Sequence, residues 1–594
     1  MIVCPRLTCT VTGSMRLINI DAFFRRESLI HSGEQVERRT KVLEFRDDET
    51  TEYAILSHRW IDPTEVDYEE MVGLAKMNRQ EQDEIRGRLG YKKIVDTCKQ
   101  AKQDGYEWVW IDTCCIDKRS SAELSEAINS MYRWYANAKI CYAYLHDVDD
   151  SFPTEEDKEK YRKSNGWPEW FSRGWTLQEM IAPRNLHFFN KDWQPIGNKK
   201  TLVRTLEWIT RVPGHTLTGG LEGNRPCVAQ IISWASNRTT TRVEDRAYSL
   251  MGLLDASMPM LYGEGKKAFH RLQLEFIRSS NDQSIFAWGH KSNNNRIGSI
   301  LADDPSDFED CSCMKLMDHN EFFEEFPELS LTSADHFDVF PITNRGIQIW
   351  MPFHRYRDSN SVFRAYLPCQ YDPHARSLVS IDLVLWNYNY YRYPSAPDRT
   401  LEKFPTEFHQ VYLRYQDTPN QTVTFDIDDS AVIENGFTRS LATNLTGNTV
   451  TLTNAKPLCI TTYCQNRGNA CFQVVYGQYF GLDWVHLDAG STGALDYVGL
   501  ESSKCRGPDW ALSMANKPSK DDDSSGRLWI SHCHLPKSTW VLRTYRVARE
   551  RSKVRLRMEV FQDSSFQNRI DEWKAYDVEV CDFFLYMDHC HDHV

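Results

Sequence analysis

Short apolar runs alternate with longer amphipathic stretches over the first third of the chain. The runs at residues 53–56, 108–111, 140–145 and 186–189 have the length and composition of strands that are buried on both faces. Stretches with apolar residues at helical spacing lie between them. Strands that alternate with helices form parallel sheets, so the pattern predicts a parallel sheet with helices on both sides.

The helices between these strands have recognisable ends. Residues 91–104 place apolar side chains on one helical face, and Gly105 follows as a stop signal. Ser120 and Glu123 have the spacing of a capping box, which predicts the start of a second helix. Its apolar face is formed by Leu124, Ile128, Met131 and Tyr135. A short helix over 175–181 is expected to end before Pro183.

The character of the chain changes twice after these elements. The charged segment 149–164 predicts a loop or an exposed helix, and residues 201–277 predict mainly helix. After about residue 284, alternating and β-branched runs separated by turn residues predict antiparallel strands. Residues 387–399 (NYNYYRYPSAPDR) are expected to be a linker or loop. No internal repeat indicates a propeller or solenoid.

These patterns divide the chain into five expected parts. Residues 1–14 are expected to be disordered or to precede the natural start at Met15. An α/β domain is expected over 15–200 and a helical extension over 201–283. Two β-rich domains are expected over 284–400 and 401–594.

Composition narrows the function classes. The chain has 594 residues, a net charge of −13 and no apolar run of membrane-spanning length. An acidic chain of this kind is not expected to bind nucleic acid broadly or to enter a membrane. Its 17 cysteines lack a C-x-x-C pair, which is typical of reduced, buried thiols in a cytoplasmic protein rather than of a disulfide framework.

Polar residues follow the first three predicted strands. Ser57, His58 and Arg59 end the first strand, Asp112 ends the second, and His146 with Asp147 ends the third. Ligands of open parallel sheets bind beyond the carboxyl ends of the strands, so these residues predict a site. Strand ends are polar in most proteins, and the pattern is also explained without a ligand.

The segment 172–179 offers a fourth contribution. Glu179 lies early in the short predicted helix, where the helix dipole favours a carboxylate. A solvated acidic residue in the first turn is the alternative interpretation.

Several segments together resemble fungal heterokaryon-incompatibility (HET) domains. The strings YAILSHRW (53–60), WIDTCCIDK (110–118) and SRGWTLQE (172–179) look like the three hallmark HET motifs. The segments MRLINI (15–20), EDRAYSLMGLLD (244–255) and MPMLYGEGKKAFHRLQ (258–273) are also similar to HET proteins. The resemblance covers residues 15–283, and the β-rich remainder resembles the tails that often follow HET domains.

HET domains in turn resemble TIR domains, which implies a TIR-like parallel sheet with flanking helices. Residues 175–180 are similar to the Trp-Cys-Leu-x-Glu-Leu motif of plant TIR enzymes, whose Glu is catalytic in NAD cleavage. The resemblance assigns that role to Glu179, while Thr176 replaces the Cys and the insertion 149–164 is not TIR-like. It implies NAD as a substrate and no resident cofactor.

The remaining strand-end residues supply candidate substrate contacts. Ser57 and Asp112 would line the site, and Arg59 could neutralise a diphosphate or instead pair with Asp112. Trp60 or Trp175 could stack on a ring, although core packing explains each indole equally well. The expected function is that of an incompatibility effector in programmed cell death and fungal innate immunity, which acts through a protein partner or self-assembly. The alternative is a non-catalytic death-signalling module that recruits partners.

Other motifs favour structural interpretations. The segment 263–267 (GEGKK) lacks the spacing of a phosphate loop, and it predicts a turn that opens a helix. Cys114 and Cys115 are expected to be buried hydrophobic residues. The His and Cys residues at 532–534 and 589–593 lack zinc-finger spacing, so no metal site is expected.

Overall fold

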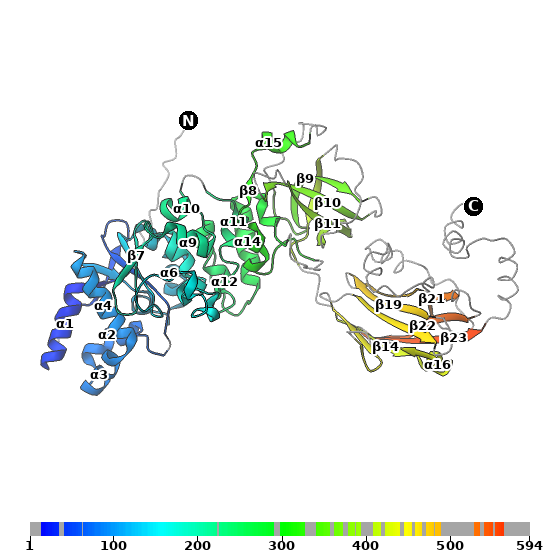
Figure 1. Ribbon diagram of the computed structural model, residues 1–594, viewed down its shortest axis with the longest axis horizontal. Coiled ribbons are helices and arrows are strands. Elements are labelled where there is room, and N and C mark those ends of the chain that lie inside the picture. The colour runs from blue at the N-terminus through cyan, green and yellow to red at the C-terminus, as the bar shows by residue number, and fades with distance from the viewer. Residues whose placement is uncertain are drawn as a thin grey trace, which may run out of the picture.

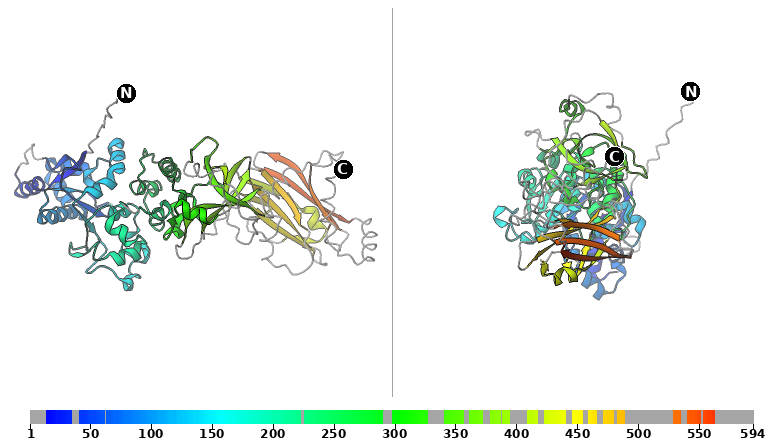
Figure 2. Two further views of the ribbon diagram at one scale, coloured as in Figure 1. Left: turned by 90° about the horizontal axis from the view of Figure 1, so that it is seen from above. Right: turned by 90° about the vertical axis from the view of Figure 1, so that its right-hand side faces the viewer.

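The structure is a computed structural model that describes residues 14–562 with gaps. The gaps are residues 35–40, 62, 223–224, 290–297, 327–339, 357–360, 372–377, 387, 394–407, 417–421, 440–444, 454–457, 466–470, 480–481, 489–527, 535–539 and 551–552. The expected N-terminal tail, apart from Ser14, and the cluster at 589–593 lie outside the described residues. An α/β part, a first β part and a second β part follow one another along the longest axis (Figures 1 and 2).

A seven-stranded sheet forms the centre of the α/β part. In spatial order its strands are β2 (Leu43–Asp47), β1 (Ser14–Asn19), β4 (Trp108–Trp110), β3 (Ala54–His58), β5 (Ile140–Tyr144), β6 (Leu186–Phe189) and β7 (Pro195–Asn198). β4, β3, β5 and β6 are parallel, which confirms the predicted parallel sheet. On one side β1 pairs with β4 and β2 with β1, and on the other side β7 pairs with β6, each in antiparallel register. The hydrophobic pattern alone does not predict these three strands.

The order of the parallel strands creates a switch point at β3. After β3 the chain adds β4 on one side, then returns and adds β5 and β6 on the other side. Because the two connections run in opposite directions, right-handed crossovers place their helices on opposite faces of the sheet. Ligands of open α/β sheets bind beyond the carboxyl ends of strands at such a point. We call the edge beyond the carboxyl ends of β3, β4 and β5 the rim.

Helices cover the sheet as the sequence predicts. α4 (Leu89–Gln103) leads into β4, and its Tyr91 contacts Phe23 of α1 (Ile20–Ser32) with 6.1 Å between ring centroids. α6 (Ser121–Asn137) leads into β5 and packs against α8 (Thr176–Ile181). Short helices at the rim are α2 (Tyr68–Gly73), α5 (Asp112–Cys115) and α7 (Glu169–Ser172), and α3 (Arg79–Gly87) packs against α4. The charged segment 149–164 contains two 3-10 turns, Glu155–Asp157 and Arg162–Ser164.

Six helices follow where the sequence predicts mainly helix. They are α9 (Val203–Thr210), α10 (Gly214–Gly219), α11 (Val228–Ser233), α12 (Asp245–Tyr248), α13 (Met251–Leu254) and α14 (Lys267–Ser279). The apolar face of α14, with Phe269, Leu272 and Phe276, is buried. The helices therefore form a second layer that packs on the α/β sheet region.

The first β part is a sheet that closes on itself. Its strands are β8 (Lys315–Leu316), β9 (Ile347–Arg355), β10 (Val362–Gln370), β11 (Leu378–Trp386), β12 (Asn389–Tyr393) and β13 (Phe408–Leu413). The order is β11-β12-β13-β9-β10-β8, and β10 also pairs with β11, so five strands form a ring. β13 belongs to this ring although it follows the expected boundary at residue 400. A helix, α15 (His319–Glu324), lies between β8 and β9.

The linker predicted over 387–399 is wrong for its first half. Residues 389–393 form β12, which pairs with β11 in antiparallel register. The aromatic residues of this segment favour a strand, and Arg392, which reads as polar in the sequence, is buried in the structure.

The second β part contains two sheets around its own core. One has the order β16-β17-β14-β23-β22-β21 and the other β15-β18-β19-β20. Their bounds are β14 (Val423–Asp428), β15 (Phe437–Arg439), β16 (Leu445–Thr446), β17 (Thr449–Leu452), β18 (Leu458–Gln465), β19 (Cys471–Tyr479), β20 (Leu482–Asp488), β21 (Leu528–His534), β22 (Trp540–Glu550) and β23 (Lys553–Gln562), with α16 (Ser430–Glu434) after β14. Phe425 and Tyr476 contact each other between the sheets at 5.5 Å. Cys464 is disulfide-bonded, an exception to the reduced thiols expected from the sequence.

The α/β part and the first β part share one hydrophobic core. It runs from Met15 to Leu413, whereas the core of the second β part is separate. Arg392 of β12 fixes the junction because it donates to the carbonyl oxygens of Phe286 at 2.9 Å and Trp288 at 2.6 Å. Its guanidinium also lies 4.7 Å from the Trp288 ring centroid. In the described residues, no helix combines the length and the apolar character needed to cross a bilayer.

The shared core predicts where the chain can be shortened. A chain ending at Gln283 loses the buried side chains of Trp288, Ile300, Leu301 and Phe308. At roughly 2 kcal/mol for each, this loss approaches the whole stability of a typical domain. We expect that chain to aggregate or to melt without a cooperative transition, as measured by circular dichroism. A chain ending at Gln416 should melt cooperatively, and equal melting of both chains would contradict the shared core.

Candidate functional site

Side chains from neighbouring parallel strands meet at the rim. Ser57 and His58 are the last residues of β3, and Asp112 begins α5 directly after β4. Successive residues of a strand point to opposite faces, so Ser57 and His58 begin two separate polar clusters. The buried Ser57 faces α8, and the buried His58 faces Glu65 and Asp112.

The first cluster joins Ser57 to Glu179. The Ser57 hydroxyl donates to Glu179 Oε2 at 2.5 Å, across 122 residues of sequence. The indole N–H of Trp170, on α7, donates to Ser57 Oγ at 2.8 Å. Tyr135 of α6 donates its hydroxyl to the Leu56 carbonyl at 3.0 Å and lies beside the Glu179 carboxyl. The structure therefore brings two predicted site residues together and surrounds them with side chains from α6 and α7.

Burial controls the protonation of Glu179. The residue is only 6% exposed, and burial raises the pKa of its carboxyl to about 8. The nearby Asp112 adds to the rise, whereas Ser57, Tyr135 and Arg173 oppose it. At pH 7 the carboxyl is therefore mainly neutral, and it becomes an anion above about pH 8.

Polar contacts at both ends hold α8 in place. At its beginning the Thr176 hydroxyl donates to the Trp170 carbonyl at 2.5 Å and receives a bond from Arg238 at 3.0 Å. At its end the buried Lys199 donates to the carbonyls of Ile181 at 3.0 Å and Pro183 at 2.7 Å. Burial lowers the pKa of this lysine to about 7. Thr176, which departs from the TIR motif, thus has a structural role here.

Arg59 pairs with Glu169 rather than with Asp112. Its Nε lies 2.7 Å from Glu169 Oε2, and both side chains are about one-third exposed. His146, which follows β5, lies 3.7 Å from the same carboxylate. The alternative of an Arg59–Asp112 bridge is therefore wrong, because α7 carries a carboxylate closer to Arg59.

Asp112 instead holds Trp60 in a fixed orientation. The Trp60 indole donates to Asp112 Oδ2 at 2.7 Å, and Lys118 Nζ lies 3.7 Å from the ring centroid. Trp60 remains 43% exposed despite these two contacts. An exposed ring that is held on its edge and covered on one face can accept a planar ligand on the other.

The second cluster surrounds His58. Its Nε2 lies 3.7 Å from Asp112 Oδ1 and 3.9 Å from Glu65 Oε2, and Lys93 pairs with Glu65 at 2.5 Å. Burial lowers the pKa of His58 well below its ordinary value, and the charge of Lys93 lowers it further. Burial raises the pKa of Asp112. In the described part of the chain, no group of three His, Cys, Asp or Glu residues is arranged to hold a metal ion.

Trp175 contacts other residues than the strand-end candidates do. Its ring is partly buried against the shared core, and its side chain hydrogen bonds with Asp245 of α12. Asp245 also accepts a bond from the Tyr262 hydroxyl at 3.0 Å. The core-packing interpretation of Trp175 therefore fits the structure better than ring stacking at the rim.

Several residues around Glu179 have no counterpart among the sequence predictions. Trp170 and Arg238 lie outside the strand ends and motifs on which those predictions depend, and Arg173 lies in the predicted segment 172–179 but is given no role there. Among them, Tyr135 could have been inferred from the sequence, because it ends the predicted apolar face of α6. A phenol on a buried face needs a hydrogen-bond partner, which points to a polar neighbour.

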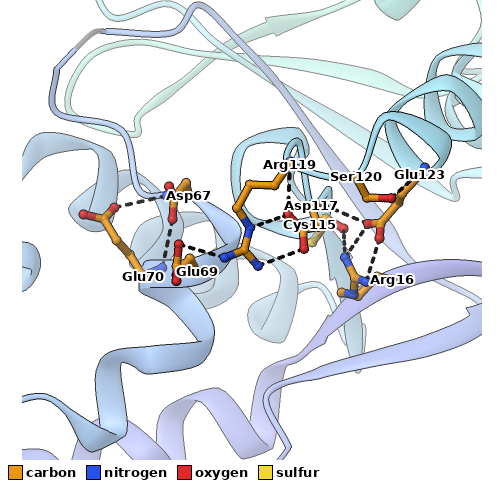
Figure 3. A network of polar contacts seen from close by, with 9 residues as sticks. All are labelled: Arg16, Asp67, Glu69, Glu70, Cys115, Asp117, Arg119, Ser120 and Glu123. Carbon is orange, nitrogen blue, oxygen red and sulfur yellow. Dashed lines mark hydrogen bonds and ion pairs between the residues drawn. The ribbon is translucent and has the colours of Figure 1, made fainter.

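A separate polar network positions the loop between α5 and α6 (Figure 3). Arg16 of β1 donates to Glu123 through both terminal nitrogens, at 2.5 and 3.1 Å, and to the Cys115 carbonyl at 3.0 Å. The Glu123 carboxylate also accepts the amide N–H of Asp117 at 2.8 Å. Ser120 Oγ accepts the Glu123 amide at 3.3 Å, as a cap should. The predicted capping box is therefore only half formed, because Arg16 and Asp117 take the carboxylate.

Arg119 continues this network to α2. It donates to Asp117 and pairs with Glu69 at 2.8 Å, as Figure 3 shows. Asp67 and Glu70 form a complete capping box at the start of α2. Asp117 of the motif WIDTCCIDK thus shapes the loop that follows α5, the helix that begins at Asp112.

Two motifs have the expected structural roles. Gly263 and Gly265 donate their amides to the Glu244 carboxylate at 2.8 and 3.0 Å, so this turn is filled by the chain itself and leads into α14. Cys114 and Cys115 are buried free thiols. A side-chain hydrogen bond with Cys115 and burial raise the pKa of Cys114 well above its ordinary value, which keeps it protonated.

Comparisons with known proteins identify the class of the α/β part. Residues 53–167 match the family model described as "Heterokaryon incompatibility protein (HET)". The α/β part therefore contains a region similar to HET domains, as the motifs predict, although Glu179 lies after the matched residues. The chain is 42% identical over 223 residues to "Vegetative incompatibility protein HET-E-1" of Podospora anserina. That alignment covers 37% of this chain and only 16% of the relative. No solved structure matches.

The protonation of Glu179 predicts how stability depends on pH. The pKa of about 8 in the folded chain exceeds the ordinary 4.5, so folding favours the neutral acid and the chain loses stability as pH rises from about 5 to 9. Glu179→Gln stays neutral, and its melting temperature should exceed that of the wild type increasingly over this range. The difference corresponds to an order of a few kcal/mol. Lys199 has the opposite pH dependence, but both chains contain it.

The exposed Glu159 provides the matched control for this experiment. Glu159→Gln removes the same charge from a side chain that is 85% exposed, and it should show no pH-dependent difference. A pH-independent offset between wild type and Glu179→Gln would contradict the assigned pKa.

Proposed function

We propose that this chain is a heterokaryon-incompatibility effector whose HET domain cleaves NAD through Glu179 in the cytoplasm. Loss of NAD would cause the programmed cell death that ends an incompatible fusion, as a form of fungal innate immunity. The observation that carries the proposal is the Ser57–Glu179 pair at the rim of the switch point. The incompatibility role is supported by the family match and by the relative's name.

The chemistry requires one carboxylate near a ribose. Cleavage of nicotinamide from its cationic precursor expels a neutral group, so the leaving group needs no acid. The transition state resembles an oxocarbenium ion, as in glycoside hydrolysis. The Glu179 carboxylate would stabilise this positive charge, and water would complete the hydrolysis. Ser57 would position the carboxylate through its 2.5 Å hydrogen bond.

The other rim residues would hold the rest of the substrate. Trp60 offers an exposed ring face for stacking, and Asp112 keeps that ring oriented. Arg59 would meet the diphosphate with its guanidinium in exchange for its present partner Glu169. Trp175 would act indirectly through its position at the start of the helix that carries Glu179.

A TIR-like architecture is part of the proposal. Numbered by their position in the chain, the four parallel strands have the spatial order 2-1-3-4. The flavodoxin-like order 2-1-3-4-5, whose ligand binds at the switch point, begins in the same way. Glu179 also follows the third parallel strand, where a side chain can reach that point.

Activation would require a conformational change. Glu179 is 6% exposed, and its partner Ser57 is itself buried and accepts the Trp170 indole N–H, so a substrate cannot meet the Glu179 carboxyl fully in this conformation. Self-assembly through the HET domain, or a protein partner, would supply the change. The β parts would then regulate the HET domain or recognise that partner.

The same burial favours a second candidate function. A carboxyl that is neutral and hydrogen-bonded by Ser57 also suits a structural residue of the core. The HET domain would then be a non-catalytic module that triggers death by recruiting partners. Measurement of NAD separates the two functions.

Nicotinamide release tests the proposal directly. Purified full chain, clustered by a fused dimeriser, should release nicotinamide from NAD. Glu179→Gln should lower the rate at least about a hundredfold, because removal of a preorganised catalytic group costs that much. Glu159→Gln should retain the full rate. Equal cell death with unchanged NAD in wild type and Glu179→Gln would instead establish the recruiting module.

The pH profile provides a second test. Only the ionised carboxyl stabilises positive charge, so kcat/KM should rise about tenfold per pH unit up to the pKa of about 8 and level off above it. Steady-state rates between pH 6 and 9.5 measure this profile. A rate that falls with pH across this range would show that the active form is the neutral acid.

A further inference from the structure

Arginine side chains gather beside Glu179 although the chain as a whole is acidic. Arg173 follows α7 directly, and Arg238 donates to the Arg173 carbonyl at 2.8 Å. Arg59 also lies next to α7, because its Nε is 2.7 Å from the carboxylate of Glu169, the first residue of that helix. Three guanidinium groups thus converge on one short helix from three separate segments of the sequence.

Acidic partners do not balance these guanidinium groups. Among the described residues, neither Arg173 nor Arg238 has a carboxylate within ion-pair distance, and Arg59 has Glu169 alone. The side chain of Arg173 makes only two long contacts, at 3.4 and 3.5 Å, with Thr241 Oγ1. An arginine that is half buried and so weakly bonded is costly unless an anion completes it.

The surrounding charges identify which groups face Arg173. Burial lowers the pKa of its guanidinium, the charge of Arg59 lowers it further, and the carboxyl groups of Glu179, Asp245 and Glu169 oppose the shift. Asp245 is bonded to Tyr262 and Trp175, and Glu169 to Arg59. The acids near Arg173 are therefore engaged elsewhere, and the neutral Glu179 contributes little negative charge.

We propose that Arg173, with Arg59 beside it and Arg238 supporting its backbone, is a binding subsite for a diphosphate. A guanidinium binds phosphate oxygens through two parallel hydrogen bonds, and two guanidinium groups can hold both phosphates of a diphosphate. Because the subsite lies beside Glu179, the ligand we expect there is the diphosphate bridge of a dinucleotide. This last step rests on the proposed NAD cleavage, whereas the anion site does not.

Arg238 has a different part in this subsite. It is almost fully buried, and its bonds go to the Arg173 carbonyl and the Thr176 hydroxyl. It therefore fixes the backbone that carries Arg173, and its positive charge acts on the neighbouring Glu179. Arg238 is a positioning residue, while Arg173 is the direct contact.

Binding of inorganic pyrophosphate tests the anion site. Wild-type full chain should bind pyrophosphate by isothermal titration at constant ionic strength, and ADP-ribose should bind more tightly because it adds a base and a ribose. Arg173→Gln should weaken both about ten- to hundredfold, the usual effect of losing a hydrogen bond between charged groups. Arg173→Lys should recover part of the affinity, since a lysine keeps the charge and loses the paired geometry.

Two controls separate folding from binding. Arg184→Gln removes a charge at a side chain that is 83% exposed, and it should bind as the wild type does. Arg173→Gln should melt close to the wild type without ligand, because its contacts are long. Equal pyrophosphate affinity in wild type and Arg173→Gln, or no pyrophosphate binding by the wild type, would overturn the subsite.

Failure of this inference is distinguishable from failure of the proposed function. Pyrophosphate binding that depends on Arg173, without NAD cleavage, would keep the subsite and reject the hydrolase. NAD cleavage with an unchanged KM in Arg173→Gln would keep the hydrolase and reject the subsite.

Discussion

The α/β part is organised by a hydrogen bond between a central strand and a short helix. Ser57 on β3 and Glu179 on α8 meet where water is excluded, and Trp170 completes the chain of donors. Burial of a carboxylate that forms no ion pair among the described residues is costly, so the carboxyl stays mainly neutral at pH 7 despite the nearby arginines. The neighbouring helices α6 and α7 supply side chains that hydrogen bond with this pair.

The periodicity of the sequence predicts the elements and the rim, but not the pairs formed there. Apolar runs of four to six residues identify β3 to β6, and parallel strands place Ser57 and Asp112 at one edge. Which carboxylate meets which donor depends on helix packing that no local spacing records. Arg59 illustrates this, because Glu169 reaches it from α7, more than a hundred residues further along the chain.

Strands with polar residues are predicted least well, for a related reason. β12 contains Arg392, whose charge makes the segment look like a linker, yet two carbonyl oxygens and the Trp288 ring make its burial possible. These partners lie more than a hundred residues earlier in the chain. The bonds of Arg392 also join the first β part to the end of the helical layer, so a sequence pattern that fails to predict β12 also fails to predict the shared core.

Under the proposed function, the charges beside α7 match a ligand that is positive at one end and negative in the middle. The oxidised nicotinamide ribose carries a positive charge, which favours ionisation of a carboxyl whose pKa is about 8. The diphosphate carries negative charge, which suits Arg173 and Arg59. A simple anion would satisfy the arginines and leave Glu179 neutral, and a simple cation would be repelled by them. Under this proposal, a ligand that carries both charges, as a dinucleotide does, would engage both halves of the site.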